Sequence, residues 1–273
     1  MNKKKQRNIR PRRRISYIPL FVILTGVLIL LYPLLGNYLA SFERSEATRN
    51  YDQTINQMSV HERKEQWNSF KKYNDFLARR SQRKQINESF DQTLDKPGEM
   101  LGMIDIPAIN IKRLPIYSGT SYKTLKKGLG HLEGSSIPIG GNHTRSVVTG
   151  HSGLSNQVLF SDIIHLKKGD IFFIRILGKN LAYEVRSTEE ILPKDVEKVK
   201  IRSNEDMVTL LTCTPPGINT YRLLVNGYRI PYQQAVERKI TKRNWLSYQN
   251  IVITSLLLCS VFWIVFRLKQ KER

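Results

Sequence analysis

The sequence predicts a mainly β domain, a barrel or a sandwich, preceded by a helical region and enclosed by two apolar segments. From Leu101 to Tyr232 the chain consists of short β-prone runs separated by Gly, Pro, Asn and Asp. Residues 41–96 contain neither Gly nor Pro, and their apolar residues recur close to helical spacing. Residues 15–40 and 244–266 carry no charge. These three observations together predict the fold class.

The two apolar segments are long enough to cross a bilayer. They run for 26 and 23 uncharged residues, whereas a membrane helix needs about 20. Eight Lys and Arg residues precede the first segment, and only Arg44 and Arg49 follow it closely. Basic residues stay on the cytoplasmic side. We therefore expect both termini in the cytoplasm and the region between the spans outside the cell.

About half of the net charge of +21 lies at the chain ends, where residues 1–14 alone carry eight Lys and Arg and no acid. The densest basic clusters flank the apolar segments, where membrane orientation accounts for them. No nucleic-acid-binding motif is present, so we do not expect a nucleic-acid partner.

The β-prone region contains seven candidate strands and one short helix. The helix is expected at residues 121–127, and the Asn226–Gly227 pair is typical of a tight hairpin turn. The strand sequences are MIDI, RLPIY, SVVTGH, IFFIRIL, LAYEVRST, VTLLTC and YRLLVNGYRI.

Only one cysteine lies outside the apolar segments. Cys259 falls in the second segment, where it fits as a small apolar residue. Cys213 is left without a disulfide partner in a region expected outside the cell. An unpaired cysteine in an exported domain indicates a free, reactive thiol.

Cys213 ends a predicted strand, and an arginine begins the next. Alternation places Thr209, Leu211 and Cys213 on one face. Pro215 and Pro216 end the strand, because proline cannot donate to a central ladder. If the two strands are antiparallel neighbours, Arg222 faces the same cleft as Cys213. Its guanidinium would favour the thiolate and hold an oxygen on which negative charge develops.

A thiol nucleophile also needs a proton donor for its leaving group, usually a histidine. His131 and His151 both lie at glycine-flanked strand ends. The residues alone leave both as candidates.

Several motifs together resemble those of the sortases, membrane-anchored cysteine enzymes of Gram-positive bacteria. They are SVVTGHSGL, LLTCTPPGINTYRLLV and the upstream IDIPAINIKRLPIYSGTSYKTLKKGLGHLEGSSIPIGG. The resemblance covers residues 98–232. The two spans, the helical region and the GHLEG and NTYRLLV runs resemble most the class C, pilus-assembling sortases.

The resemblance implies a closed eight-stranded β-barrel and a transpeptidase. It implies Cys213 as nucleophile on the Thr–Gly carbonyl of an LPXTG-like sorting signal, and His151 as general acid and later base. Arg222 would bind substrate and stabilise the oxyanion. A lysine amine of a pilin subunit, or a cell-wall precursor, would resolve the thioacyl enzyme. No cofactor and no metal are implied, and His131 becomes structural.

The sequence departs from the class C pattern at two places. Tyr221 stands where relatives often have histidine. The Asp-Pro-aromatic motif of the class C lid is missing, and Asp95-Lys96-Pro97 is the nearest sequence to it. A housekeeping sortase, a hydrolytic cysteine peptidase and a non-enzymatic adhesion or scaffold module remain alternatives.

The expected organisation has seven segments. They are a basic cytoplasmic tail (1–14), a transmembrane helix (15–40), an extracellular helical region (41–97), the catalytic barrel (98–232), a linker (233–246), a second transmembrane helix (247–267) and a cytoplasmic tail (268–273).

Overall fold

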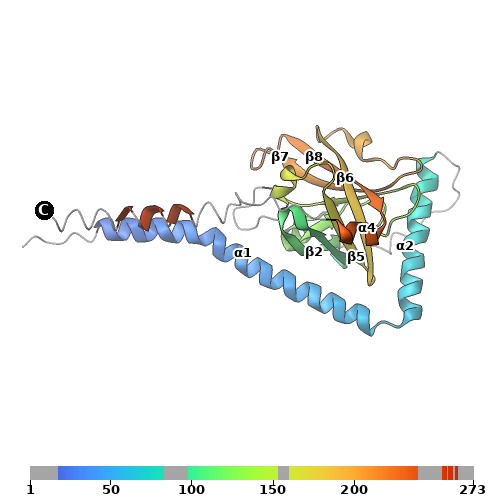
Figure 1. Cartoon of the computed structure of the whole chain (residues 1–273), viewed down its shortest axis with the longest axis horizontal. Helices are drawn as coiled ribbons and strands as arrows, with labels where there is room; N and C mark the ends of the chain where they lie inside the picture. The colour runs from blue at the N-terminus through green and yellow to red at the C-terminus, as the bar shows by residue number, and fades with distance from the viewer. Residues whose placement is uncertain are drawn as a thin grey trace, which may run out of the picture.

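Eight strands close into a barrel, which lies toward the right of the view in Figure 1. The computed structural model describes residues 18–82, 98–152, 160–238, 254–256, 258–260 and 262–263. Around the barrel the strand order is β1-β2-β3-β4-β7-β8-β6-β5. The strands are β1 (Met100–Ile106), β2 (Ile111–Ser118), β3 (Leu129–His131), β4 (Thr144–Thr149), β5 (Ile171–Ile176), β6 (Lys179–Ile191), β7 (Asp206–Thr214) and β8 (Tyr221–Ile230). The closed barrel, rather than a sandwich, is confirmed.

Two of the strand pairs are parallel. β2 pairs with β3 and β4 pairs with β7 in parallel, while the other neighbours are antiparallel. Parallel strands end at the same edge of a sheet. The C-terminal ends of β4 and β7 therefore lie side by side, which positions the site described below.

Each of the seven predicted strands lies within, or largely overlaps, one strand of the barrel, and α3 (Tyr122–Lys127) is the predicted short helix. The strand that sequence reasoning missed is β3, which has only three residues, one of them glycine. Short connecting 3-10 turns are η2 (Pro107–Ile109), η3 (Ser161–His165) and η4 (Val196–Val199), and α4 (Tyr232–Glu237) follows β8.

The predicted hairpin turn at Asn226–Gly227 is wrong. Both residues lie inside β8 and are buried. A Cβ on Gly227 would lie 2.3 Å from Cζ of Phe172. This glycine therefore makes room for an aromatic ring that stacks on Tyr183, with 5.5 Å between ring centroids. The side-chain amide of Asn226 belongs to a buried polar network.

Two long helices precede the barrel. α1 (Ile18–Gln57) and α2 (Val60–Ser81) are separated by a sharp turn. Ser59 caps α2: its hydroxyl accepts from the Glu62 backbone N–H at 3.1 Å, and the Glu62 carboxylate accepts from the Ser59 N–H at 2.7 Å. In Figure 1, α1 extends well beyond the barrel, passes beneath it, and α2 returns along its side.

Both helices pack against the barrel. The Tyr51 hydroxyl donates to the Leu101 carbonyl at 2.7 Å and accepts from the Leu177 N–H at 3.0 Å. Burial raises the pKa of Tyr51 to about 12. On α2, the side-chain amide of Asn74 pairs with both backbone groups of Ile137, at 2.9 and 2.8 Å.

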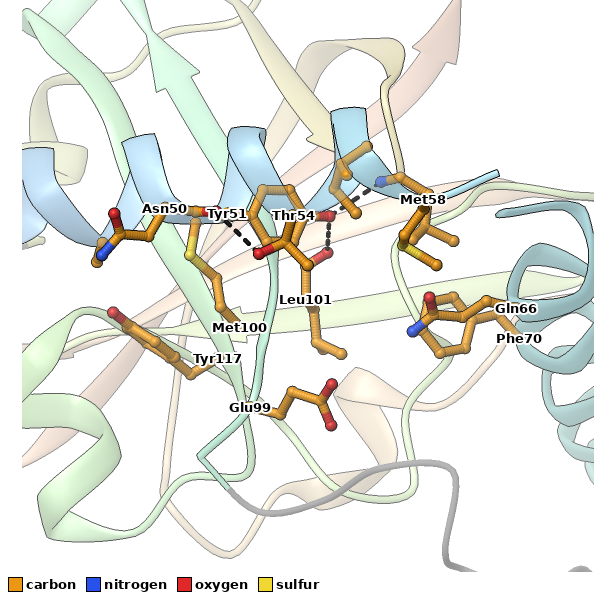
Figure 2. Close-up of a pocket in the computed structure, with 13 residues that line it drawn as sticks. Asn50, Tyr51, Thr54, Met58, Gln66, Phe70, Glu99, Met100, Leu101 and Tyr117 are labelled. Atoms are coloured by element: carbon orange, nitrogen blue, oxygen red, sulfur yellow. Dashed lines mark hydrogen bonds between the residues drawn. The ribbon is translucent and has the colours of Figure 1, made fainter. Parts of the chain in front are cut away.

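A cavity of about 550 Å³ remains at the junction of α1, α2 and β1 (Figure 2). Tyr51, Phe70, Leu101 and Tyr117 are among the residues that line it. β1 is four positions from β7 around the closed barrel. The cavity therefore lies across the barrel from Cys213.

The two expected membrane spans are not confirmed. Among the described residues, no helix combines the length and the apolar character that crossing a bilayer requires. The start of the first expected span and most of the second lie outside the described residues, as do residues 83–97, which include the Asp95-Lys96-Pro97 sequence.

Candidate active site

Cys213 is the penultimate residue of β7, and its side chain faces away from the barrel core. Val208 and Leu210 belong to the hydrophobic core, so the alternating residues Thr209, Leu211 and Cys213 lie on the outer face. This is the alternation that the sequence predicts. Cys213 is half-buried and forms no disulfide.

Arg222 lies directly opposite Cys213 on the neighbouring strand. β7 and β8 are antiparallel, and Cys213 and Arg222 are partners in the ladder. Opposite residues in such a pair project from the same face, with Cβ atoms about 4.5–5.5 Å apart. Nη1 of Arg222 donates to the carbonyls of Asn219 and Tyr221, at 3.0 and 3.1 Å. These bonds hold the guanidinium at the β7–β8 loop, next to the strand end that carries Cys213.

His151 follows the strand that runs parallel to the cysteine strand. Thr149 of β4 pairs with Leu211 of β7. His151 is two residues after Thr149, and Cys213 is two residues after Leu211. Because the strands are parallel, both residues lie at the same edge of the barrel. The structure therefore brings together the three residues singled out in the sequence.

Gly150 is held firmly to the cysteine strand. Its N–H donates to the Leu211 carbonyl at 3.1 Å, and its own carbonyl accepts from the Thr212 hydroxyl at 2.9 Å. A Cβ at Gly150 would lie 2.6 Å from Cδ2 of Leu129 and 2.9 Å from Cβ of Phe160. Only glycine fits this close approach, which leads directly into His151.

The imidazole of His151 is partly desolvated. Its Nε2 is buried and has no hydrogen-bond partner among the described residues. The ring lies beside exposed Tyr122, with 6.3 Å between centroids and 58° between planes. Burial lowers the pKa of His151 below its ordinary value near 6.5. The ring is therefore mainly neutral at pH 7, and its Nε2 makes no hydrogen bond to the residues that the structure describes.

Two of the other histidines, His131 and His143, have structural settings. His131 is completely buried, and its Nε2 lies 3.0 Å from the Ser136 carbonyl and 3.1 Å from the Ser135 hydroxyl. His143 accepts the Asn204 N–H at 3.0 Å through Nδ1. These contacts leave His151 as the histidine beside the thiol.

Sequence reasoning missed a buried polar network on the face of the sheet that carries Cys213. It joins Arg145 of β4, Thr209 of β7 and Asn226 of β8. Arg145 is only 1% exposed. The one sequence feature that could have revealed it is a lone basic residue inside the β-prone run TRSVVT.

A second cavity, of about 340 Å³, lies next to the nucleophile strand. Thr214, the residue after Cys213, lines it together with Leu223 and Glu190. No cluster of His, Cys, Asp and Glu side chains able to hold a metal ion is present among the residues that the structure describes.

A family model described as "Sortase domain" matches residues 104–230. Solved structures named sortase C are also similar. One from Clostridium perfringens SM101 is 42% identical with a TM-score of 0.61, covering 68% of this chain and 99% of that chain. Another, of C. perfringens sortase C with the C-terminal cell wall sorting motif, is 45% identical with a TM-score of 0.63 and the same coverage. Sortase C of Streptococcus pneumoniae is 41% identical with a TM-score of 0.60, covering 68% and 97%.

Curated relatives agree on the family. Sortase A of Bacillus anthracis is 30% identical over 142 residues, which are 52% of this chain and 65% of that protein. Sortase A of Streptococcus agalactiae is 30% identical over 131 residues, 47% of this chain and 52% of that protein. Sortase D of Bacillus subtilis is 26% identical over 218 residues, 78% and 98% of the two chains. The similar solved structures reported above are named sortase C, in agreement with the class C resemblance of the motifs. The chain therefore belongs to the sortase family.

Proposed function

We propose that this sortase is a cysteine transpeptidase that cleaves an LPXTG-like sorting signal between Thr and Gly and transfers the acyl group to a lysine amine of a pilin subunit. The observation that carries the proposal is the register of three strands. β7 and β8 set Cys213 opposite Arg222, and β4 runs parallel to β7 into His151.

In the first half-reaction, Sγ of Cys213 attacks the threonine carbonyl carbon of the signal. The neutral His151 ring takes the thiol proton and then delivers it to the departing glycine amine as the C–N bond breaks. A thioester between Cys213 and the threonine carbonyl remains. In the second half-reaction, the acceptor amine attacks the thioester, His151 takes its proton, and the thiolate leaves and is reprotonated.

Arg222 supplies positive charge where the carbonyl oxygen becomes negative. Its side chain shares a face with Cys213 and is anchored through Nη1 to two loop carbonyls. A guanidinium held in advance stabilises an oxyanion without reorganisation at the moment of reaction. This role explains why a cation is kept at the edge of the site.

The substrate class rests on the similarity to sortase C structures, one of which is described with a C-terminal cell wall sorting motif. Pilus assembly is proposed over wall anchoring because the solved neighbours reported above are sortase C enzymes at 41–45% identity. The housekeeping alternative, transfer to a cell-wall precursor, is favoured by the curated relatives named sortase A.

We place the protein in the cell membrane, with the barrel outside and both termini in the cytoplasm. Support comes from the uncharged segments at 15–40 and 244–266 and from the eight basic residues before the first. Protease added to intact cells should digest the barrel and leave an epitope at either terminus protected. Digestion of a terminal epitope would contradict this orientation.

Product partition tests the transpeptidase function. The full chain is incubated with an LPXTG peptide, with and without a pilin that carries an acceptor lysine. Joining of peptide to pilin, abolished by Cys213→Ala, is the expected result. Hydrolysis alone in both conditions would indicate a peptidase, and no cleavage with alkylation-resistant Cys213 would indicate the scaffold alternative.

A further inference from the structure

Arg145 carries a charge that is almost completely buried, and all three of its donor nitrogens are used. Nε donates to the Thr209 hydroxyl at 2.9 Å, Nη1 to the Lys200 carbonyl at 3.1 Å and Nη2 to Asn226 Oδ1 at 3.0 Å. Burial, with Arg202 nearby, lowers the pKa of Arg145 to about 10, so the side chain remains a cation at neutral pH. A buried charge is costly unless its partners are well placed.

The partners of Arg145 belong to three different segments. Thr209 lies on β7, Asn226 on β8, and Lys200 on the connection from β6 to β7, residues 192–205. Asn226 extends the network, since its Nδ2 donates to Ser187 at 3.1 Å and to Glu189 at 3.3 Å, both on β6. The Arg145 side chain on β4 is thus hydrogen-bonded to β7, to β8 and to the connection between β6 and β7.

The β6–β7 connection lies over the face that carries the nucleophile. Thr209 and Cys213 share a face of β7, and Asn226 and Arg222 are their ladder partners on β8. Thr209 is completely buried, whereas Cys213 is half-buried. Four residues of strand separate them, about 13 Å at 3.3 Å per residue. Ile191, the last residue of β6, pairs with Arg222, which in turn pairs with Cys213. The connection therefore begins at the edge of the barrel that carries Cys213.

The connection presents apolar side chains to its surroundings. Leu192 is 40% exposed and Val196 is 59% exposed. Lys198 lies 3.8 Å from Glu189, so a second contact ties the connection to the network. An extended peptide that reaches Cys213 along this face meets the edge of the connection.

We propose that Arg145 is a positioning residue: with Thr209 and Asn226, it holds the β6–β7 connection in the place that admits the sorting peptide to Cys213. The inference rests on the proposed transpeptidase function for its kinetic part. Arg145 touches neither the thiol nor the substrate. Its loss should weaken peptide binding and loosen the connection, while the chemistry of Cys213 stays intact.

The test compares Arg145→Met in the full chain with Arg80→Met, which makes the same change at an exposed position on α2. Arg145→Met should raise KM for an LPXTG peptide about tenfold, equivalent to 1.4 kcal/mol, with kcat and the rate of Cys213 alkylation by iodoacetamide unchanged. Amide hydrogen exchange should accelerate in residues 192–205 but not in β7. Arg80→Met should change none of these.

Thr209→Val keeps the shape and removes one acceptor, so it serves if Arg145→Met does not fold. Thr209→Val should also raise KM and accelerate amide hydrogen exchange in residues 192–205, each by a smaller factor than Arg145→Met. A folded Arg145→Met or Thr209→Val chain with unchanged KM and unchanged exchange in residues 192–205 would overturn the proposal. So would a fall in the alkylation rate that matches the loss of activity. If the unaltered chain processes no sorting peptide, the proposed function fails, and the exchange measurement still decides the role of Arg145.

Discussion

At the scale of single residues, the site depends on how backbone contacts place ordinary side chains. His151 gains its setting from Gly150, whose carbonyl accepts from the Thr212 hydroxyl. Arg222 is fixed by bonds to the carbonyls of its own loop. Histidine and arginine are common residue types, so the chemistry follows from the position of His151 and Arg222 at the same barrel edge as Cys213.

The ionisation of His151 can be measured directly. Because burial lowers its pKa, the imidazole should titrate with a midpoint below 6.5 and be neutral at pH 7. The measurement is an NMR titration of the ring protons, with His151→Gln used to assign the signal. A midpoint at or above 6.5 would contradict the desolvated setting and the use of a neutral ring to take the thiol proton.

Arg222 should act on the chemical step. Arg222→Ala should lower kcat by about 100-fold, the size typical for loss of an oxyanion donor. Arg222→Lys should recover part of the rate, since it keeps the charge but not the fork of donors. Steady-state kinetics measure both variants, and alkylation of Cys213 reports that the site remains folded. A change below threefold for Arg222→Ala would argue against the role.

At the scale of elements, two parallel strand ends and one antiparallel hairpin create the site, and two helices brace the barrel. The capping box at Ser59 starts α2, and Asn74 on that helix fastens it to the Ile137 backbone. The Asn74 side chain therefore supplies hydrogen-bond partners to the backbone of Ile137, a residue that lies outside the strands.

Removing that fastening should weaken the docking of α2. Asn74→Ala leaves the buried N–H of Ile137 unpaired, which costs about 1–3 kcal/mol. The Ile137 carbonyl loses one of its two donors and keeps the Ile139 N–H at 2.7 Å. Asn68→Ala changes an exposed asparagine on the same helix and should alter stability by less than about 0.5 kcal/mol. Chemical denaturation measures both. Equal stability of the two variants would show that the Asn74 contacts contribute nothing.

Much of this arrangement was predictable because it is local. Alternation in VTLLTC predicted that Thr209, Leu211 and Cys213 share one face, and Pro215 marked the end of the strand. The structure shows that this face points away from the core. The Asn226–Gly227 prediction failed because the requirement for glycine there comes from Phe172, a distant residue that needs the space. The role of Arg145 was not predictable either, since its partners are 55–81 residues away in the chain.

At the scale of the whole molecule, the helices and the nucleophile occupy different sides of the barrel. α1 and α2 pack on the barrel through Tyr51 and Asn74. The nucleophile lies four strands away from β1, across the closed barrel from the helix junction. The described helices α1 and α2 therefore lie away from the side of the barrel that carries Cys213.

The central claim is that Cys213 forms a thioester with the sorting peptide. The most direct test is intact-mass spectrometry of the full chain after incubation with an LPXTG peptide and no amine acceptor, followed by mapping of the modified residue. The account predicts an adduct of the peptide up to its threonine on Cys213, lost on adding an amine and missing in Cys213→Ala. An unmodified Cys213 while the peptide is cleaved, or an adduct on another residue, would contradict it.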